Sequence, residues 1–248
     1  MNVLIIVPTY NERENLPVLL DYILAHYDYR VMVVDDQSPD GTGAVADEYA
    51  QRHPTRIEVM HRTGPRGLGR SYIDGMKRAL AGTADVVCQM DADFSHDPKY
   101  LSDLVAGTSH YDLVIGSRYL HGISVVNWPL RRVILSAFAN WYVRSITRLT
   151  VRDCTAGFRA WRRDALASMP IDGMLSEGYA FVVEMTFEAA RRGYRIGEVP
   201  IIFVERREGV SKMSRQVLTE SMLMPWRLVW RGLWRSRSGG SKSGGSGS

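Results

Sequence analysis

Two carboxylates, Asp91 and Asp93, stand one residue apart directly after the largely apolar run Val86–Met90. Such a run is typical of a buried parallel strand, and the carboxyl ends of these strands face the crevice in which open α/β sheets bind ligands. Mg²⁺ takes oxygen ligands, usually one or two carboxylates together with substrate phosphates. The pair therefore predicts a site for a divalent cation and a diphosphate. The alternative is a solvated Asp-x-Asp turn, because that spacing alone is common.

Two further acidic loops follow predicted strands. Glu12 lies in the loop after the strand Val3–Val7, while Asp35 and Asp36 end the strand Val31–Val34. Because the carboxyl ends of parallel strands meet at one edge of a sheet, we expect these carboxylates close to the Asp-x-Asp pair. A ligand with hydroxyl and amine donors, bound together with a metal, explains three such loops better than solvated charges do.

Strands and helices alternate over the first 118 residues, which predicts an α/β fold with a mostly parallel sheet and right-handed crossovers. No Gly-x-Gly-x-x-Gly follows the first strand and no P-loop motif occurs, so a dinucleotide-binding fold and a P-loop fold are both disfavoured. The strands are predicted at 3–7 (ended by Pro8), 31–34, 57–61, 86–90 and 112–116. The first helix is predicted to run from an N-cap at Asn11 to residue 27, two more cover 42–52 and 70–80, and a fourth begins at residue 98.

A long helix is predicted over 130–149, after the alternation stops at Tyr119. Polar residues recur there at every fourth position and form a basic stripe, while apolar residues fill the other side. Such a helix either packs on the sheet or lies in a membrane interface. The stripe consists of Arg132, Ser136, Asn140, Arg144 and Arg148, and the apolar side of Val133, Ala137, Phe138, Trp141, Tyr142, Ile146 and Leu149.

The last predicted helix carries Trp226, Trp230 and Trp234 at four-residue spacing, each followed by an arginine. Tryptophan beside arginine, with no acid nearby, suits the headgroup boundary of an anionic membrane. The alternative is a tryptophan ridge packed on the protein's own core.

Between the helix over 130–149 and this last helix, we predict a strand through Trp161 and two helices, one from Asp164 and one over 179–192. A further strand is predicted over 197–204, and its Pro200 favours a position at the edge of the sheet.

The net charge is only +4 over 248 residues, but it is unevenly distributed. No Asp or Glu occurs between Leu113 and Arg152, or after Glu220. A basic second half suits an anionic partner, which can be phosphate, a membrane surface or nucleic acid.

Two cysteines without a pattern suit a reducing compartment. With no long uncharged apolar run and no basic N-terminal region, we expect neither a transmembrane helix nor a signal peptide.

Eight short segments, most of them at predicted strand ends, form an ordered set: Pro8-Thr-Tyr-Asn-Glu12, Val34-Asp-Asp36, Ser38-Pro-Asp-Gly-Thr42, Asp91-Ala-Asp93, Gly116-Ser-Arg-Tyr119, Asn127-Trp-Pro-Leu-Arg-Arg132, Thr155-Ala-Gly-Phe-Arg159 and Gly209-Val-Ser-Lys-Met213. Together they resemble the dolichol/polyprenyl-phosphate mannose synthases. The resemblance is closest to the actinobacterial polyprenol monophosphomannose synthases that lack transmembrane helices of their own. It runs from about residue 2 to about residue 236, and eight motifs in order are specific although each alone is weak.

This resemblance implies a GT-A fold, in which helices flank a mostly parallel sheet and amphipathic helices form a membrane interface. It implies one domain over 1–236, with a nucleotide-binding half over 1–118 and an acceptor and membrane-interface half over 119–236. The tail 237–248 is rich in Gly and Ser and is typical of an artificial linker. The implied reaction is an inverting transfer of mannose from GDP-mannose to a polyprenyl phosphate with Mg²⁺ or Mn²⁺. The implied location is peripheral, on the cytoplasmic face of an anionic membrane, with a separate membrane-anchoring protein as an optional partner.

The resemblance also assigns roles to residues. Asp91 and Asp93 hold the metal and, with Arg118, form the catalytic set. Ser95 stands where some members have glutamine, and Arg70 stands where a small residue is usual. The donor nucleotide is assigned to Pro8, Tyr10, Glu12, Val34, Asp36, Asp91, Ala92, Asp93, Ser95, Arg206 and Lys212, and the acceptor phosphate to Arg118, Arg132 and Ser136.

The chemistry fits these residue types. A phosphate monoester has a second pKa of about 6, so it is already anionic near neutral pH and needs positive charge rather than a base. Arginine supplies that charge in a planar fork that matches phosphate oxygens. Three other readings remain open: a UDP-glucose donor, since one Asp can pair with either base; a non-catalytic nucleotide-sugar-binding protein; and a nucleic-acid binder, which lacks a recognised motif. Intact Asp91 and Asp93 disfavour the second of these.

Overall fold

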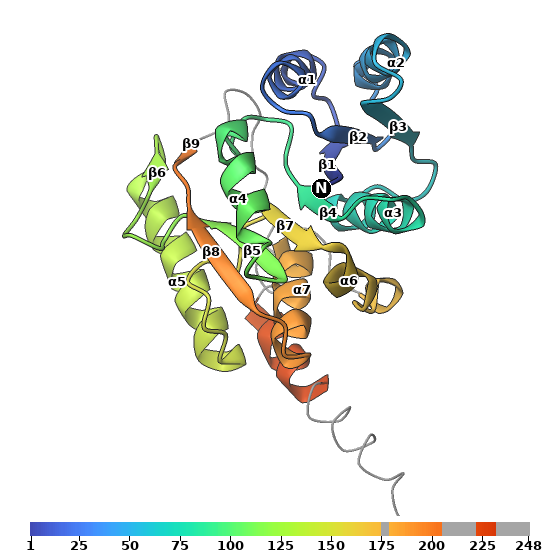
Figure 1. Ribbon diagram of the computed structural model, residues 1–248. Coiled ribbons are helices and arrows are strands. Elements are labelled where there is room, and N and C mark those ends of the chain that lie inside the picture. Colours follow the sequence, from blue (N-terminus) through green and yellow to red (C-terminus); the bar gives the residue numbers. More distant parts are fainter. Residues whose placement is uncertain (175–178, 205–221, 232–248) are drawn as a thin grey trace, which may run out of the picture.

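A seven-stranded sheet organises the chain in the computed structural model, which describes residues 1–174, 179–204 and 222–231 (Figure 1). The strand order is β3-β2-β1-β4-β7-β5-β8. Neighbouring strands are parallel except where β7 lies antiparallel between β4 and β5. The prediction of an α/β fold with a mostly parallel sheet is therefore confirmed. The strands are β1 (Val3–Thr9), β2 (Arg30–Asp35), β3 (Ile57–His61), β4 (Val86–Gln89), β5 (Leu113–Ser117), β7 (Arg159–Arg162) and β8 (Ile196–Pro200).

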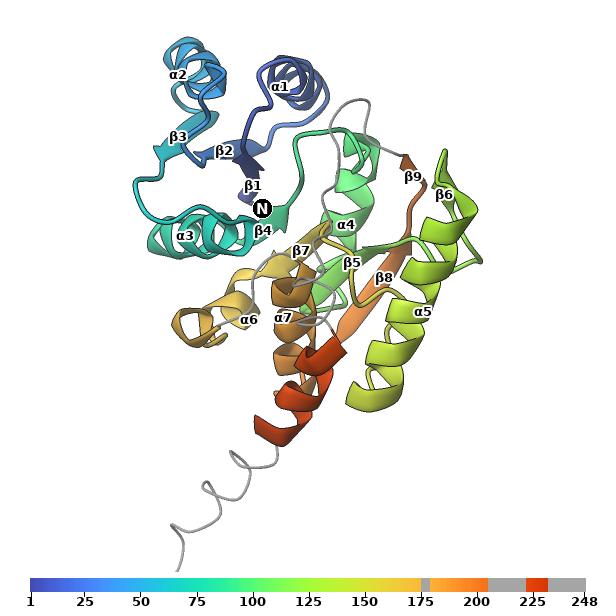
Figure 2. The same cartoon turned by 180° about the vertical axis from the view of Figure 1, so that it is seen from behind.

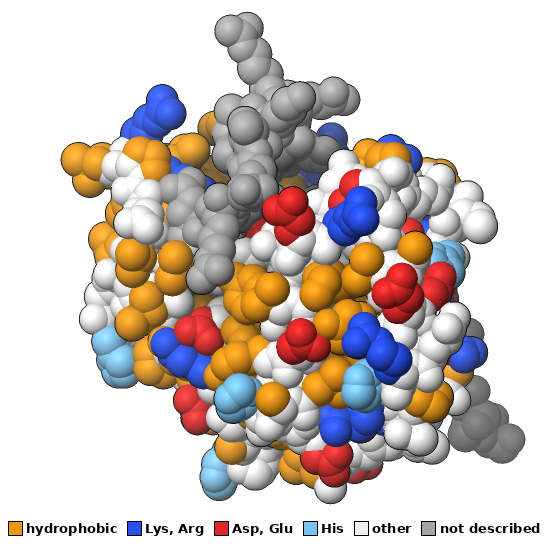
Figure 3. Space-filling model, turned by 90° about the horizontal axis from the view of Figure 1, so that it is seen from above, with side chains coloured by type: hydrophobic (Ala, Val, Ile, Leu, Met, Phe, Trp, Pro, Cys, Tyr) orange, Lys and Arg blue, Asp and Glu red, His pale blue; other side chains and the backbone are white. Residues whose placement is uncertain are grey.

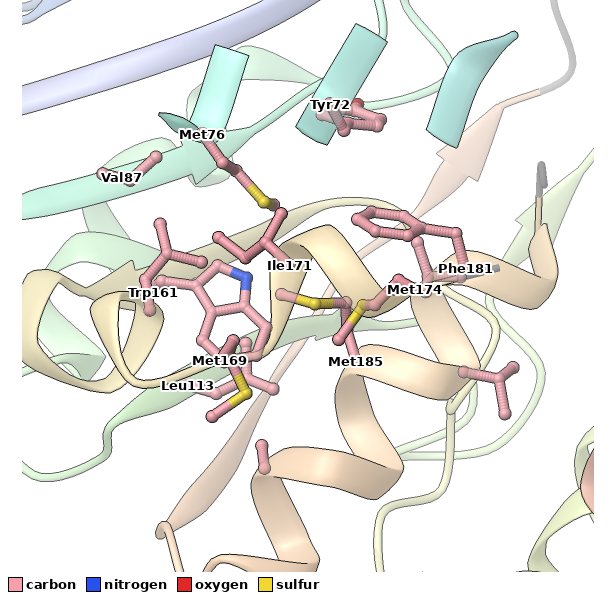
Figure 4. Close-up of a cluster of buried hydrophobic side chains, with 14 of the residues drawn as sticks. Tyr72, Met76, Val87, Leu113, Trp161, Met169, Ile171, Met174, Phe181 and Met185 are labelled. Atoms are coloured by element: carbon pink, nitrogen blue, oxygen red, sulfur yellow. The ribbon is translucent and has the colours of Figure 1, made fainter. Parts of the chain in front are cut away.

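Helices cover both faces of this sheet (Figures 1 and 2). Side chains alternate between the two faces along β1, so Ile5 joins one core with α1, α2 and α4, and Ile6 joins the other with α3 and α7. Figure 4 shows the second core, in which Trp161 of β7 lies among methionine side chains. The helices are α1 (Asn15–His26), α2 (Thr42–Arg52), α3 (Leu68–Ala81), η1 (Pro98–Tyr100), α4 (Leu101–Gly107), α5 (Leu130–Thr147), α6 (Arg163–Ala167), η2 (Ile171–Gly173) and α7 (Tyr179–Arg191).

The strand order changes direction at β1, which lies between β2 and β4. In open α/β sheets the ligand crevice lies outside the carboxyl ends of the strands at such a switch point. The loops after β1, β2 and β4 carry the three acidic segments that contain Glu12, Asp36 and Asp91. The topology therefore brings together residues that are up to about 80 positions apart in the chain.

Two predicted boundaries near the N-terminus are wrong. Strand β1 continues through Pro8, which pairs with Val34, because the ladder to β4 ends at Ile6 and no amide hydrogen is required on that side. Helix α1 begins at Asn15 rather than after Asn11. Asn11 instead adopts a left-handed conformation, with φ of 60°, which turns the chain away from β1.

The single strand predicted over 197–204 is two strands in the structure. Strand β8 ends at Pro200 on the edge of the main sheet, so the predicted edge position of this proline is confirmed. The chain then forms β9 (Phe203–Val204), which pairs in parallel with β6 (Val125–Val126) in a separate two-stranded sheet. This small sheet places Phe203 beside the loop that leads into α5.

Candidate active site

The Asp91 and Asp93 carboxylates lie immediately beyond the end of β4. The Tyr72 hydroxyl donates to Oδ1 of Asp91 at 2.9 Å, and the Asp91 backbone N–H donates to Nδ1 of His96 at 3.0 Å. Asp93 is buried, and both the hydroxyl and the backbone N–H of Ser95 donate to its Oδ1. These hydrogen bonds hold both carboxylates in place, and Asp93 is buried while Asp91 is partly exposed, which favours a built site over a freely solvated Asp-x-Asp turn.

The Tyr72 hydroxyl that donates to Asp91 is buried, and the positive charge of Arg159 acts on the same hydroxyl. Burial raises the pKa of Tyr72 well above its ordinary value, and the charge of Asp91 adds to the rise, so the hydroxyl remains a neutral donor. Arg159 of β7 is fully buried and donates to the carbonyl groups of Ala156 at 2.6 Å and Val182 at 2.7 Å. Burial lowers the pKa of Arg159 to about 10, which leaves the guanidinium charged near neutral pH. A fixed positive charge therefore lies in the core on this side of the sheet.

The Asp91 and Asp93 pair fits a hard divalent cation. No cluster of three or more His, Cys, Asp or Glu side chains suited to a metal occurs within the described ranges. Two carboxylates are nevertheless the usual protein contribution to Mg²⁺ where substrate phosphates and water complete the shell, and oxygen ligands suit Mn²⁺ equally. The donor set thus accounts for a cation that binds together with a phosphorylated substrate.

The carboxyl ends of β2 and β3 form the next part of the crevice. Asp36 is buried, accepts a hydrogen bond from Nη1 of Arg62, and accepts the Gly67 backbone N–H at 2.8 Å at the start of α3. Arg62 also donates to Asp74 of α3 at 2.8 Å. Both oxygens of Asp36 thus have protein partners and retain lone pairs for further donors. The sequence reasoning missed Arg62, although a basic residue directly after β3 was a possible signal.

The loop after β1 places Tyr10 and Glu12 at the edge of the same crevice. The guanidinium of Arg66 lies 4.7 Å from the centre of the Tyr10 ring and donates to its hydroxyl at 2.9 Å. The Glu12 backbone N–H donates to Oγ1 of Thr42 at 2.9 Å. These bonds tie the β1 loop to α2 and to the segment before α3. Arg66 is a further residue at this edge that the sequence reasoning did not single out.

Arg118, immediately after β5, forms the core of a second cluster. Its Nε and Nη2 donate to the two oxygens of Asp153 at 2.7 Å each, and its backbone N–H donates to the same carboxylate at 3.0 Å. Burial alone would raise the pKa of Asp153, but the charge and hydrogen bonds of Arg118 hold that pKa below its ordinary value. Asp153 is therefore an ionised partner of Arg118.

Aromatic rings surround Arg118 and connect it to the other predicted acceptor residues. The guanidinium lies 5.5 Å from the ring centres of Tyr119 and Phe203, and 5.7 Å from that of Trp128. The Arg132 guanidinium lies 4.1 Å from the Trp128 ring, and the Tyr119 hydroxyl donates to Ser136 at 2.8 Å. The predicted trio of Arg118, Arg132 and Ser136 thus gathers around one aromatic cluster.

Ring contacts join the carboxylate side of the site to the arginine side. His96, which accepts the Asp91 N–H, packs edge-on against Phe203 with ring centres 5.8 Å apart. Phe203 in turn packs edge-on against Trp128 at 5.4 Å. We call the three residues His96, Phe203 and Trp128 the aromatic partition. The two clusters are therefore joined by direct contacts. Arg206 and Lys212, also predicted to bind the donor, lie outside the described residues.

Comparison with known proteins gives both a family match and relatives. A family model described as "Glycosyl transferase family 2" matches residues 4–169. The polyprenol monophosphomannose synthase of Mycolicibacterium smegmatis is 47% identical over 223 residues, which cover 88% of this chain and 83% of that protein. The undecaprenyl-phosphate mannosyltransferase of Micrococcus luteus is 46% identical over 244 residues, which cover 96% of this chain and 100% of that protein.

Solved structures share the fold at lower identity. Glucosyl-3-phosphoglycerate synthase from Mycobacterium tuberculosis, in complex with Mn²⁺, UDP and phosphoglyceric acid, superposes with a TM-score of 0.67 at 19% identity and covers 90% of this chain and 78% of its own. A mannosyltransferase from Pyrobaculum calidifontis, in complex with GDP-Man and Mn²⁺, gives a TM-score of 0.55 at 20% identity and covers 98% and 76%. At these identities the likeness shows a common fold.

Proposed function

Because the chain belongs to glycosyl transferase family 2, we propose that it transfers mannose from GDP-mannose to a polyprenyl phosphate, releasing GDP. Transfer of mannose to a polyprenyl phosphate follows from relatives that are 46–47% identical over most of the chain. The aromatic partition carries the proposal, because it links the loop of Asp91 on one side to Arg118 and Arg132 on the other. In a transfer between two phosphorylated substrates, the first side would serve the donor diphosphate and the second the acceptor phosphate.

On the carboxylate side, Asp91 and Asp93 would hold Mg²⁺ or Mn²⁺. When bound, the cation supplies charge neutralisation for the departing diphosphate. Tyr72 and Ser95 orient the carboxylates through the hydrogen bonds described above. Hydrogen bonds of this kind, made to the side chains that bind a metal, generally set the orientation of those side chains. The Mycobacterium and Pyrobaculum structures each contain Mn²⁺, which agrees with the use of a divalent cation.

On the arginine side, Arg118, Arg132 and Ser136 bind and orient the acceptor phosphate. Since that phosphate is already ionised near neutral pH, it can attack the sugar carbon without a general base. Asp153 serves to hold Arg118 in place, since it is buried and paired. Attack from the arginine side, with departure of the diphosphate on the carboxylate side, inverts the configuration at the sugar carbon. The pH–rate profile should then follow the acceptor, and its acid limb should move when an acceptor with a different phosphate pKa is used.

We assign binding of the donor base to Asp36 and to the neighbouring loop that contains Tyr10 and Glu12. GDP-mannose is favoured over a uridine donor because the M. smegmatis and M. luteus relatives are both named for mannose transfer. The Pyrobaculum neighbour, which contains GDP-Man, agrees with this assignment. UDP-glucose remains the competing donor for the test below, since the Mycobacterium neighbour contains UDP.

The surface of α5 supports docking on a membrane. Its polar stripe faces the protein: Asn140 is buried and accepts the Cys154 N–H at 2.9 Å, and Ser136 accepts from Tyr119. Only part of the predicted apolar side faces outward, because Phe138 and Trp141 are exposed whereas Leu149 is buried. Other apolar side chains of α5 are exposed beside these two, which reverses the arrangement of a solvated helix. The face in Figure 3, by contrast, mixes hydrophobic, acidic and basic side chains. The exposed apolar residues of α5 are Leu130, Ile134, Leu135, Phe138 and Trp141.

The helix at 222–231 extends this outward apolar surface. The Trp226 indole donates to the Tyr142 hydroxyl of α5 at 3.1 Å, so the two helices lie side by side (Figures 1 and 2). Trp226 and Trp230 are exposed while Leu228 is buried, so the alternative of a ridge packed on the core is wrong for these two tryptophans. Trp234 lies outside the described residues. We assign this surface to peripheral contact with an anionic bilayer, whose headgroups attract the arginines that flank the tryptophans.

None of the helices in the described ranges combines the length and apolarity needed to cross a bilayer.

The test incubates the purified chain with labelled GDP-mannose, UDP-glucose and other nucleotide sugars, Mn²⁺ and farnesyl phosphate. We expect label to enter the lipid extract from GDP-mannose alone, and Asp93→Ala to abolish that transfer. Transfer from UDP-glucose instead would replace the donor assignment. Binding of nucleotide sugar without any transfer would favour the non-catalytic alternative.

A further inference from the structure

Three buried side-chain nitrogens have no hydrogen-bond partner in the part of the chain that the structure describes: Nε2 of Gln89, Nε1 of Trp128 and Nε of Arg144. Such groups are uncommon in native proteins and require an explanation. Gln89 lies within β4, where its Oε1 accepts from Trp161. Arg144 is twelve residues beyond Arg132 on α5, about 18 Å along the helix. Trp128 alone of the three touches the predicted acceptor residues.

We propose that the indole N–H of Trp128 donates a hydrogen bond to an oxygen of the acceptor phosphate. This inference rests on the proposed function and adds a binding residue to it. An indole N–H donates and cannot accept, so its partner must carry a lone pair. The guanidinium groups of Arg118 and Arg132 lie 5.7 Å and 4.1 Å from the centre of the same ring. Arg118 is paired with Asp153, and the positive charge of Arg132 beside the ring favours an anionic oxygen as the acceptor. A phosphate monoester presents three such oxygens, enough for both arginines and the indole.

The surroundings of Trp128 hold the ring ready for this contact. Phe203 packs edge-on against it, with ring centres 5.4 Å apart and planes at 77°. Trp128 also directly precedes Pro129, whose fixed backbone angle starts α5. A donor held by rigid neighbours loses little freedom on binding. The N–H is shielded from solvent, and the Arg132 guanidinium stacks on the same ring, so phosphate reaches the N–H when the Arg132 side chain moves aside and the indole stays in place.

The direct measurement is the indole ¹H–¹⁵N spectrum of the full chain, which contains six tryptophans. Trp128→Phe and Trp128→His each identify the Trp128 signal by its disappearance, so the assignment stands if either variant folds. Farnesyl phosphate should move that proton signal downfield, as a hydrogen bond to an anionic oxygen does. GDP with Mg²⁺ should leave it in place, which separates the acceptor phosphate from the donor diphosphate.

The kinetic measurement uses the same variants. Trp128→Phe keeps an aromatic ring and deletes the N–H, so the KM for farnesyl phosphate should rise by about 10-fold or more, while the KM for GDP-mannose stays the same. Trp128→His retains a ring N–H and should recover part of the loss. Tyr111→Phe is the control, because Tyr111 is an exposed aromatic residue before the start of β5, whereas Arg118 follows the end of that strand, and it should leave the acceptor KM unchanged.

The outcomes separate this inference from the proposed function. If the wild type transfers mannose to farnesyl phosphate but the Trp128 signal does not move, the proposed function stands and the Trp128 role is wrong. If GDP with Mg²⁺ moves the signal and farnesyl phosphate does not, the acceptor assignment is also wrong. If the wild type neither binds nor mannosylates farnesyl phosphate, the proposed function itself fails.

Discussion

Asp153→Asn tests the idea that a buried carboxylate holds Arg118 in position. The substitution preserves the shape of the side chain and removes its charge. In the wild type, Asp153 is fully buried and accepts three hydrogen bonds from Arg118 at 2.7–3.0 Å and one from the Thr155 hydroxyl at 3.2 Å. Removing one partner of such a pair leaves an uncompensated buried charge, which costs about 3–5 kcal/mol. Because the amide retains one acceptor oxygen, we expect the lower end of that range, about 3 kcal/mol.

The assay is thermal unfolding followed by circular dichroism at pH 7. For a chain of this size, a change of 1 kcal/mol in the free energy of unfolding shifts Tm by about 2–4 °C, so Asp153→Asn should lower Tm by about 6–12 °C. Asp28→Asn is the control, since Asp28 forms an exposed ion pair with Arg56 at 3.2 Å and such pairs contribute little. The double variant Arg118→Met/Asp153→Leu should lose less stability than Asp153→Asn, because it leaves no unpaired charge.

The same pair predicts how stability depends on pH. The pKa of Asp153 is lower in the folded state than its unfolded value of about 3.9, so the pair stabilises the fold above that pH. This stabilisation is lost as the pH falls through the folded pKa, and the Tm gap between wild type and Asp153→Asn should therefore narrow below about pH 4. A Tm for Asp153→Asn within 2 °C of wild type at pH 7, or a gap that widens in acid, would refute the reasoning.

Four further substitutions test other parts of the structure. Asp93→Ala should abolish turnover at unchanged Tm, and turnover that persists in chelator would contradict the metal role. Asp36→Ala should weaken GDP binding in calorimetry by about 1.5–3 kcal/mol, and equal affinity would exclude a base contact. The hydrogen bond that His61 donates to the Asp47 carboxylate raises the pKa of His61, so protonated His61 stabilises the fold below about pH 6.5, and this effect is lost as the pH rises through the raised pKa. His61→Gln should therefore lower Tm more at pH 5.5 than at pH 8.5, and an equal loss of Tm at both values would count against this. Trp230→Ser should reduce sedimentation with anionic liposomes at unchanged Tm, and unaltered sedimentation would argue against docking by this residue.

Local sequence pattern determined most of the secondary structure. Apolar runs such as 3–7 and 31–34 predicted buried strands, and the helices over 42–52 and 130–147 agree with their apolar and polar spacing. The errors occur where neighbouring strands decide the outcome. Pro8 stays in β1 because β4 has already ended, and the last strand divides because β9 finds a partner in β6 rather than in the main sheet.

Residue type and motif order also determined the chemistry of the site. Two carboxylates after a strand predicted the metal side, and arginines in a region without acids predicted the phosphate side. This works because charge and ligand preference belong to the side chain itself, wherever the chain carries it.

Tertiary structure alone decided which groups support these residues. Arg62 meets Asp36 from 26 positions away, and Asp153 meets Arg118 from 35 positions away, so no local pattern reveals either pair. It also decided that α5 turns its polar side inward, because Asn140 and Ser136 satisfy buried donors from other loops. A helical pattern shows that two sides differ, but only the packing partners determine which side faces the solvent.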